Sequence, residues 1–441
     1  MKSVSVGLLG LGTVGQGVVN ILLRNAAEIG RRCGAEVRVT VATVRNRAKA
    51  EALGLDLVVT TDPADVVDDP AIDIVCEAMG GEQPALDFIL RAIDNGKHVV
   101  TANKALIAIH GNEIFARARE KGVVVAFESS VAGGIPVIKA LREGLVANRI
   151  EWLAGIINGT GNFILTAMSE EGRDFADVLA EAQALGYAEA DPEFDIEGID
   201  AAHKLTIMAS VAFGIPLQFD KVFTEGISRI DPEDVVAAEE MGYRIKHLGI
   251  ARRRDDGIEL RVHPTLIPSR RLLANVNGVM NAILVQGDAV GPTLYYGAGA
   301  GAEPTGSAMV ADIVDVVRML DADSRHQVPH LAFRADALAD DEVLSPPDFE
   351  SAYYLRLRAQ DRPGVMSDIA GIFGKANVSI EALNQKEPKT GAGADGNVSD
   401  VQITLLTRRV REGVIREAIE AVNALPAVTE GVSFLRVETL T

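Results

Sequence analysis

Short apolar runs alternate with amphipathic segments over residues 1–130. Residues 4–9 (VSVGLL) are typical of a short strand, and three glycines separate them from an amphipathic helix predicted over 14–27. Residues 36–44 form a second strand, apolar and β-branched, as expected of a strand buried on both faces. Further strands are predicted over 72–76, 98–101 and 123–127, with helices over 84–95 and 113–121. This alternation predicts an α/β fold with a doubly wound, parallel Rossmann sheet.

The regular alternation ends after Glu128. Residues 129–300 mix glycine-rich turns, helices and extended runs such as 259–265, which predicts a second domain of α+β type. The acidic stretch 336–351 contains two adjacent prolines and is predicted to be a linker. Beyond it, strands are predicted over 353–359, 378–386, 400–407 and 428–437, with helices over 364–377 and 412–424. The order βαββαβ is that of a ferredoxin-like domain, with a Gly- and Asp-rich loop over 387–399 that we expect to be mobile.

The composition narrows the class of protein. The chain has 441 residues, which suggests about three domains. Lys and Arg number 43 against 62 Asp and Glu, so the net charge of −19 disfavours nucleic acid as a partner. A stretch of 18 uninterrupted apolar residues does not occur, so we expect no membrane span. The two cysteines, Cys33 and Cys76, form no CxxC motif; we expect them to pack rather than react, in a reduced, cytoplasmic protein.

The glycine turn after the first strand predicts a nicotinamide dinucleotide site. Gly10 permits a tight turn, Gly12 leaves room for a pyrophosphate, and Gly15 lets helix and strand pack closely. The helix amino terminus at Thr13 and Val14 then offers N–H donors and a favourable dipole to the phosphates. The alternative is a glycine turn that packs a helix without any ligand.

The end of the second strand indicates which dinucleotide is preferred. The run ATVRNRAK contains no carboxylate that could hold a ribose 2′-hydroxyl. Arg45, together with Lys49, is placed to pair with a 2′-phosphate. We therefore favour NADP, with NAD possible; the alternative is a solvated, basic helix start.

A second informative stretch gathers carboxylates before one lysine. Glu189, Asp191, Asp195 and Asp200 precede Lys204. Asp200 and Lys204 are four residues apart in a predicted helix that starts near residue 198, so they share one helical face. A solvent-exposed ion pair of this spacing is the alternative, and it would contribute only a few tenths of a kcal/mol.

A second lysine, Lys104, follows the strand 98–101, at the carboxyl edge where ligands of such sheets bind. Two lysines and several carboxylates near a nicotinamide suit a substrate with an amino group and a carbonyl. Carboxylates would hold the ammonium, and a lysine would give or take the proton that accompanies hydride transfer. His203 is about 100° from Lys204 around the helix, so we expect it to face elsewhere.

The chain resembles a homoserine dehydrogenase of the long, regulatory type. The resemblance spans residues 6 to about 312 and rests on GLLGLGTVGQGV, TANKALIA, FESSVAGGIP, GIINGTGNFIL, GYAEADPEFDIEGIDAAHKL and YYGAGAGAEPTGSAMVAD. The tail resembles an ACT domain, through DRPGV over 361–365 between a strand and a helix. The resemblance implies NAD(P)-dependent, reversible reduction of L-aspartate 4-semialdehyde to L-homoserine, in threonine, methionine and isoleucine biosynthesis.

The resemblance also implies roles for single residues. Lys204 matches the family's proposed proton donor, and Lys104 matches a lysine near substrate and nicotinamide, so the proton carrier stays open between them. Substrate-side positions are Glu189 and Asp200, which bind the amino end, and Asp195. Positions near the cofactor are Gly186 and Gly301. A bound sodium ion is implied on the backbone carbonyls of Glu128, Val131, Gly133 and Ile135, the alternative being a glycine-rich hinge without an ion.

The implied organisation has three working parts. Residues 1–135, completed by 301–330, bind the nucleotide; residues 136–300 bind substrate and dimerise; residues 352–441 form the ACT domain. The resemblance implies that the ACT domain senses an amino acid, L-threonine, and that the protein forms a homodimer or homotetramer. Two alternatives stay open: another amino-acid semialdehyde dehydrogenase, and a non-catalytic nucleotide and amino-acid sensor.

Overall fold

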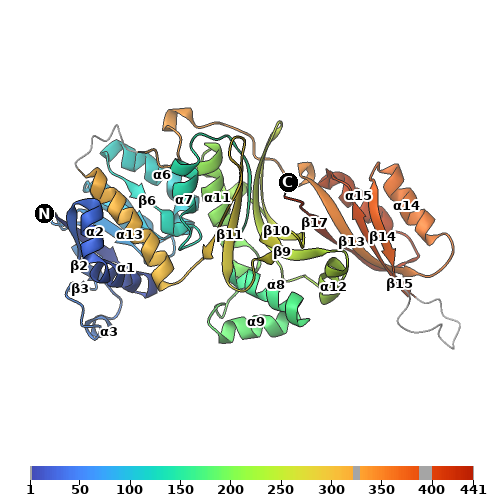
Figure 1. Ribbon diagram of the computed structural model, residues 1–441, viewed down its shortest axis with the longest axis horizontal. Coiled ribbons are helices and arrows are strands. Elements are labelled where there is room, and N and C mark those ends of the chain that lie inside the picture. The colour runs from blue at the N-terminus through green and yellow to red at the C-terminus, as the bar shows by residue number, and fades with distance from the viewer. Residues whose placement is uncertain (1, 321–327, 387–399, 441) are drawn as a thin grey trace.

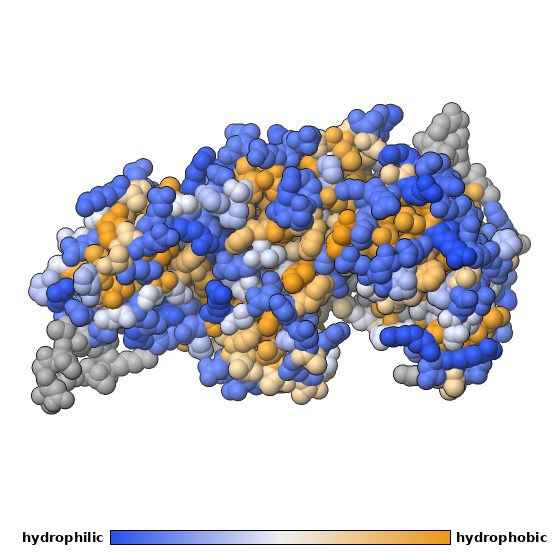
Figure 2. Space-filling model, turned by 180° about the vertical axis from the view of Figure 1, so that it is seen from behind, coloured by the Kyte–Doolittle hydropathy of each residue, from blue (hydrophilic) through white to orange (hydrophobic). Residues whose placement is uncertain are grey.

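The computed structural model describes residues 2–320, 328–386 and 400–440. The chain forms an elongated molecule in which a parallel sheet with its helices lies at one end, a mixed sheet in the middle and the C-terminal unit at the other end (Figure 1). On the face shown in Figure 2, polar residues cover much of the surface and apolar residues appear in patches between them. Within the described ranges, no helix combines the length and apolar character that a membrane crossing requires.

The first sheet is parallel throughout, with strand order β3-β2-β1-β4-β5-β6. Its strands are β1 Lys2–Leu9, β2 Ala35–Thr43, β3 Val58–Thr60, β4 Ile74–Glu77, β5 His98–Thr101 and β6 Val125–Ala126. The order reverses between β1 and β4, which is where open α/β sheets bind ligands. The predicted Rossmann sheet is therefore confirmed. The edge strand β3 was not predicted, because its three residues are too few to show a period.

Helices cover both faces of this sheet (Figure 1). They are α1 Thr13–Arg24, α2 Ala26–Cys33, α3 Arg47–Glu51, α4 Ala64–Val67, α5 Ala85–Asp94, α6 Lys104–Lys121 and α13 Ala302–Met319. The single helix predicted over 14–27 is wrong, since the chain breaks at Asn25 into α1 and α2. The helix predicted over 113–121 begins nine residues earlier, because the Asn103 side chain caps it by accepting a hydrogen bond from the N–H of Leu106 at 3.2 Å.

Helix α13 returns to the first sheet from far along the chain. Its residues Met309 and Ile313 share a buried cluster with Val6 of β1 and Val18 of α1. The contact with α1 is close enough to need glycine: a Cβ on Gly17 would lie 2.1 Å from the carbonyl oxygen of α13's first residue. The two helix amino termini therefore lie side by side.

The second sheet is mixed, has eleven strands and runs from the middle of the molecule into the C-terminal unit (Figure 1). Its order is β12-β11-β7-β9-β10-β17-β13-β15-β14, with β8 beside β10 and β16 beside β13. The middle strands are β7 Ile150–Ile156, β8 Phe223–Thr224, β9 Tyr243–Arg254, β10 Gly257–Pro268, β11 Met280–Gly287 and β12 Gly291–Ala298. The helices of this region are α7 Val137–Lys139, α8 Gly159–Glu171, α9 Phe175–Ala184, α10 Glu193–Ile196, α11 Ile199–Phe213 and α12 Pro232–Glu240.

The C-terminal unit has the predicted βαββαβ order. Its elements are β13 Glu350–Gln360, α14 Val365–Lys375, β14 Ile380–Gln385, β15 Asp400–Thr407, β16 Val410–Arg411, α15 Glu412–Asn423 and β17 Val428–Val437. The strand order β17-β13-β15-β14 is ferredoxin-like. A short parallel pairing, Thr265 with Arg436 and Leu266 with Val437, joins β10 to β17. The loop predicted over 387–399 lies outside the described residues.

The stretch 336–351, predicted as a linker, packs along the middle sheet. Val343 bridges Ile258 of β10, and the N–H of Leu344 donates to the carbonyl of Ile258 at 2.9 Å. Phe349 at its end is fully buried. The acidic, proline-containing composition did not reveal this, because a few apolar residues in an irregular segment are enough to anchor it.

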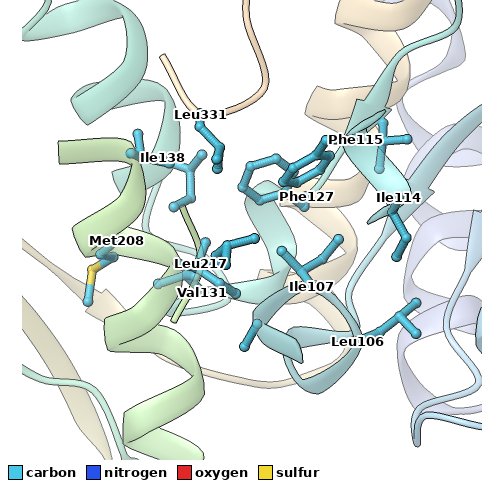
Figure 3. Packing of buried hydrophobic residues seen from close by; sticks show 14 of the residues in the cluster. Leu106, Ile107, Ile114, Phe115, Phe127, Val131, Ile138, Met208, Leu217 and Leu331 are labelled. Carbon is cyan, nitrogen blue, oxygen red and sulfur yellow. The ribbon is translucent and has the colours of Figure 1, made fainter. Parts of the chain in front are cut away.

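One buried cluster joins the first sheet's helices to the middle of the molecule (Figure 3). Leu106, Ile107 and Phe115 of α6 lie in the same core as Met208 of α11 and Ile283 of β11. Dense packing of this kind resists relative movement. Helices α6 and α11 are thus held together, and each carries one of the two lysines singled out in the sequence.

Gly17→Ala should weaken the contact between α1 and α13. The added Cβ would meet backbone, which cannot swing aside, so we expect a loss of about 1–3 kcal/mol and a lower midpoint of thermal unfolding. Gly371→Ala in α14 is the matched control, because nothing lies within 4 Å of its Cβ position. Calorimetry of both variants checks this, and equal midpoints would contradict the close contact.

Candidate active site

Two lysines from different helices share one buried carboxylate. Lys104 is the first residue of α6, and its Nζ lies 2.9 Å from Asp200 Oδ1. Lys204 lies one turn after Asp200 in α11, and its Nζ donates to Asp200 Oδ2 at 2.7 Å. Asp200 is 3% exposed. The structure therefore brings together the pair predicted from spacing and the lysine predicted at the sheet edge.

The end of β7 completes the surroundings of this carboxylate. The Nζ of Lys204 also donates to the carbonyl oxygen of Ile157 at 2.7 Å. The Nδ2 of Asn158 donates to Asp200 Oδ2 and to Asp195 Oδ1, both at 2.8 Å. Asn158 also caps α8 through its Oδ1. Sequence reasoning missed Asn158; the signal was an asparagine before Gly-Thr-Gly, which is typical of a helix N-cap.

The charges in the cluster shift one another's titration. Burial alone would raise the pKa of Asp200, but the two ammonium groups hold the pKa below its ordinary value. Burial lowers the pKa of Lys204, and the attraction of Asp200 does not offset it. Burial also acts to lower the pKa of Lys104, but this side chain is 34% exposed and the attraction of Asp200 raises the pKa overall. Lys204 thus gives up its proton more readily than Lys104.

The other two predicted carboxylates, Asp195 and Glu189, are less buried than Asp200. Asp195 in α10 is half-buried, and burial followed by repulsion from Asp200 raises its pKa. Glu189 is exposed, and its charge adds a smaller contribution, after Asp200 and Asp195, to raising the pKa of Lys104. Carboxylates of decreasing burial therefore lead outward from the two lysines.

The glycine turn has the geometry predicted for a dinucleotide site. Gly10 has a φ of +101°, and a Cβ there would lie 2.8 Å from the carbonyl oxygen of Ala78. A Cβ on Gly15 would lie 2.2 Å from the carbonyl oxygen of Gly10. Gly12 faces open space, and α1 begins directly after it at Thr13, with Val14 half-buried. The turn is closed on its inner side and open where a pyrophosphate would approach.

The basic residues after β2 are not equivalent. Arg45 is exposed, one residue beyond the half-buried Val44. Arg47 forms an ion pair with Glu51 at 2.7 Å within α3. The side chain of Lys49 lies outside the described part of the structure. Arg45 is thus the clearer candidate for a phosphate.

The turn before α13 packs against the side-chain amide of Asn281. Gly301 caps α13 with a φ of +127°. A Cβ on Gly299 would lie 2.2 Å from Asn281 Cγ. Asn281 is 1% exposed, and neither its Oδ1 nor its Nδ2 has a hydrogen-bond partner among the described residues. Such an orphaned donor and acceptor fit a polar ligand group. Sequence reasoning missed Asn281, because nothing in its strand distinguishes this asparagine from its neighbours.

Gly186 was also predicted to lie near the cofactor. It is exposed just after α9 and has a φ of +75°.

A buried glutamate at the end of β4 also escaped prediction. Glu77 Oε1 accepts the N–H groups of Met79 and Gly80 at 2.7 and 3.1 Å, and Oε2 accepts the Thr101 hydroxyl at 2.6 Å. Burial raises the pKa of Glu77. This carboxylate ties together the ends of β4 and β5, just before Lys104. The available signal was an acidic residue ending an otherwise apolar strand.

The segment implied to bind sodium is a strained turn. Ala132 and Gly133 have φ of 54° and 45°. The carbonyls of Glu128 and Ile135 accept local backbone hydrogen bonds, whereas no hydrogen bond to those of Val131 and Gly133 is found among the described residues. No group of three or more His, Cys, Asp or Glu in the described ranges is placed to hold a metal ion.

The Glu128 carboxylate is held by backbone N–H groups of the next element. It accepts the N–H groups of Ile138 and Lys139 at 2.9 and 2.8 Å, at the start of α7. Burial, followed by repulsion from Asp312, raises its pKa to about 7. Glu128 thus ties the turn to the start of α7 through its side chain.

His203, which we expected to face elsewhere than Lys204, lies against aromatic side chains. Its ring stacks on Phe219 with centroids 4.2 Å apart, and Phe194 lies at 5.5 Å. Neither ring nitrogen has a partner among the described residues, and burial lowers its pKa to about 4. Cys33 and Cys76 are free thiols, and burial raises the pKa of Cys76.

Comparison with protein families covers most of the chain. Residues 10–128 match the model described as the homoserine dehydrogenase NAD-binding domain, residues 136–314 match the homoserine dehydrogenase model, and residues 353–427 match the ACT domain. The homoserine dehydrogenase of Pseudomonas aeruginosa is 61% identical over the full length of both chains, and that of Neisseria gonorrhoeae is 53% identical over 440 residues.

Several solved structures that are similar to this chain are also homoserine dehydrogenases. A homoserine dehydrogenase from Thiobacillus denitrificans superposes with a TM-score of 0.95 at 62% identity, covering 100% of this chain and 99% of that one. The enzyme from S. aureus gives 0.75 at 31% identity, with 99% of each chain covered. A hyperthermophilic archaeal homoserine dehydrogenase in complex with NADPH gives 0.61 at 27% identity, covering 71% of this chain and 97% of that one.

His203→Phe should reduce the loss of stability on acidification. A histidine titrates near 6.5 when unfolded but near 4 in this pocket, so below pH 6.5 the unfolded state binds the extra proton and stability falls as pH falls. This one group accounts for about 1.4 kcal/mol between pH 7.5 and pH 5.5. Thermal unfolding at both pH values checks it: the variant should show the smaller change, and an equal change would contradict the assignment.

Proposed function

This chain belongs to the homoserine dehydrogenase family, NAD(P)-dependent oxidoreductases that act on a CH–OH group, and we propose that its reaction is the reversible reduction of L-aspartate 4-semialdehyde to L-homoserine. The observation that carries the proposal is Asp200 shared between Lys104 and Lys204. Such a site offers negative charge for an ammonium group and a proton for an aldehyde oxygen. We place the reaction in threonine, methionine and isoleucine biosynthesis.

Substrate binding is assigned to the outward row of carboxylates. Glu189 and Asp200 hold the substrate ammonium, and Asp195 supports them from α10. Asn158 fixes the relative position of Asp195 and Asp200 through its two hydrogen bonds. A substrate held in this way presents its other end to the two lysines.

Proton transfer is assigned to Lys204. Its lowered pKa makes it the better acid, and two of its three N–H groups are used by Asp200 and Ile157, which leaves one for the substrate oxygen. Lys104, whose pKa is raised, keeps its proton and supplies a fixed positive charge beside the oxygen as it gains negative charge.

The cofactor, when bound, supplies or accepts the hydride. Its phosphates are assigned to Gly10, Gly12 and Gly15 and the N–H groups of Thr13 and Val14. Lys104, Gly186 and Gly301 line the path to the nicotinamide, and the orphaned amide of Asn281 fits a carboxamide, which also has one donor and one acceptor side. NADP is favoured over NAD because Arg45 is exposed where a 2′-phosphate would lie.

Further assignments concern an ion, an effector and assembly. The carbonyls of Glu128, Val131, Gly133 and Ile135 would hold a sodium ion, supported by the strained turn and the two unpaired oxygens. The ACT match supports an amino-acid effector, which we assign as L-threonine, in a homodimer or homotetramer. We assign three working units: the nucleotide-binding unit (residues 1–135 together with 301–330), the substrate-binding unit (136–300) and the ACT domain (352–441). We place the enzyme in the cytoplasm.

Lys204→Ala should abolish most turnover while sparing cofactor binding. Loss of the proton donor should lower kcat by roughly 10²- to 10⁴-fold. Oxidation of NADPH, followed by absorbance with L-aspartate 4-semialdehyde, measures the rate, and fluorescence titration measures NADPH binding. Wild-type kcat in the variant would rule out Lys204 as the donor; no turnover by the intact protein would rule out the reaction itself.

Arg45→Ala should change cofactor preference. Removing a charge-assisted bond to a 2′-phosphate should raise KM for NADPH roughly 10- to 100-fold and leave KM for NADH within about twofold. Arg47→Ala is the matched control, because Arg47 is already paired with Glu51. If Arg45→Ala affects NADPH and NADH equally, the 2′-phosphate assignment fails.

A further inference from the structure

A short segment that begins with β8 and ends before α12 touches both the C-terminal unit and the candidate active site. This bridging segment, residues 223–228, follows β10 on one side, where the N–H of Glu225 donates to the carbonyl of Val262 at 2.8 Å. It forms no part of the catalytic cluster. Its side chains and backbone nevertheless make specific polar contacts in two directions.

The first direction leads to β17 of the C-terminal unit. The Nη1 of Arg436 lies 3.0 Å from Glu225 Oε2. The same guanidinium is 1% exposed and donates twice to Glu412, each time at 2.7 Å, and it lies 5.0 Å from the ring centre of Phe223. Glu225 therefore extends a buried ion pair of the C-terminal unit into the middle of the molecule.

The second direction leads to the turn between α10 and α11. The N–H of Ile227 donates to the carbonyl of Ile196 at 2.9 Å, and the Ser228 hydroxyl donates to Glu197 Oε1 at 2.6 Å. Gly226 lies so close that a Cβ there would be 2.1 Å from Glu197 Oε2. Glu197 stands two residues after Asp195 and three before Asp200, so these contacts fix the turn between two substrate-side carboxylates.

A buried histidine reinforces the same connection. The Nε2 of His247 lies 3.0 Å from the carbonyl oxygen of Glu225, and because a carbonyl only accepts, this nitrogen carries the hydrogen. The same edge of the ring is close to Gly198, whose Cβ position lies 3.1 Å from His247 Cε1 and 3.3 Å from Nε2. Gly198 is the N-cap of α11 and has a φ of +85°. Because glycine has no side chain, the His247 ring can approach the start of the helix closely.

We propose that Glu225 is a positioning residue that couples β17 of the C-terminal unit to the α10–α11 turn and so to the placement of Asp195 and Asp200. A shift of Arg436 would move Glu225, and the bridging segment would carry that shift to Glu197 and Gly198. The positioning role of Glu225 is inferred from these contacts alone. The further statement that an effector acts through Glu225 rests on the proposed threonine response.

Glu225 is also the contact that can be removed with least damage. Its side chain is 35% exposed, and without it the buried Arg436 guanidinium keeps both of its hydrogen bonds to Glu412. Arg436 and Glu412, by contrast, are fully buried. Deleting residues 352–441 would expose Arg261, which is 0% exposed and pairs with Glu438 at 2.6 Å, so the full-length chain is the better test object.

Glu225→Ala should raise KM for L-aspartate 4-semialdehyde by roughly three- to tenfold, the effect of losing about one hydrogen bond. We expect kcat and KM for NADPH within about twofold of wild type, and faster hydrogen–deuterium exchange over residues 193–203. Ser228→Ala breaks the other end of the connection and should show the same pattern. Arg416→Gln is the matched control: Arg416 also pairs with Glu412, at 2.6 Å, but within the described part of the chain it forms no hydrogen bond or ion pair with the bridging segment.

Four results would decide between the possible outcomes. Wild-type KM and exchange in Glu225→Ala would overturn the positioning proposal, as would an equal change in Arg416→Gln. If L-threonine inhibits wild type, Glu225→Ala should need several-fold more threonine for half-inhibition, and an unchanged response would overturn transmission through Glu225. If threonine does not inhibit wild type, the proposed effector is wrong, and the KM comparison alone still decides the positioning role.

Discussion

The shared Asp200 carboxylate is the interaction on which the site depends. Burying a carboxylate is costly unless charged partners compensate, and here two ammonium groups and an asparagine amide do so. Those partners come from α6, α11 and the end of β7, so the cluster exists only when the nucleotide-binding sheet and the middle sheet pack together. The apolar core between α6 and α11 supplies that packing (Figure 3).

Sequence patterns revealed what depends on local order. Alternating strands and helices predicted the parallel sheet, and the i, i+4 spacing placed Asp200 beside Lys204. The start of α6 at Lys104 was missed, because the apolar run after it shows no clear helical period and hides the Asn103 cap. Asn158 and Asn281 matter through contacts with distant segments, and no spacing rule encodes such contacts. The family resemblance, not periodicity, supplied the substrate and the individual roles.

The C-terminal unit is not a loosely tethered module. Its sheet continues the middle sheet through β17, and buried charges cross the junction, among them Arg261 with Glu438 and Arg356 with Asp234. Buried pairs of this kind add little net stability but strongly favour one geometry, because displacing either partner leaves a charge unpaired. The junction thus specifies how the unit sits, which is the condition for a small shift within it to be felt elsewhere.

The return of α13 to the first sheet has a consequence for synthesis of the chain. Val6 and Val18 are buried partly by Met309 and Ile313, which leave the ribosome some three hundred residues later. Until then the amino-terminal sheet carries an uncovered apolar face and cannot complete its core, although its own strands and crossover helices are already made. The nascent protein must therefore keep that face from aggregating for most of the time needed to translate it, and the residues of the middle sheet are all made before the first domain can close.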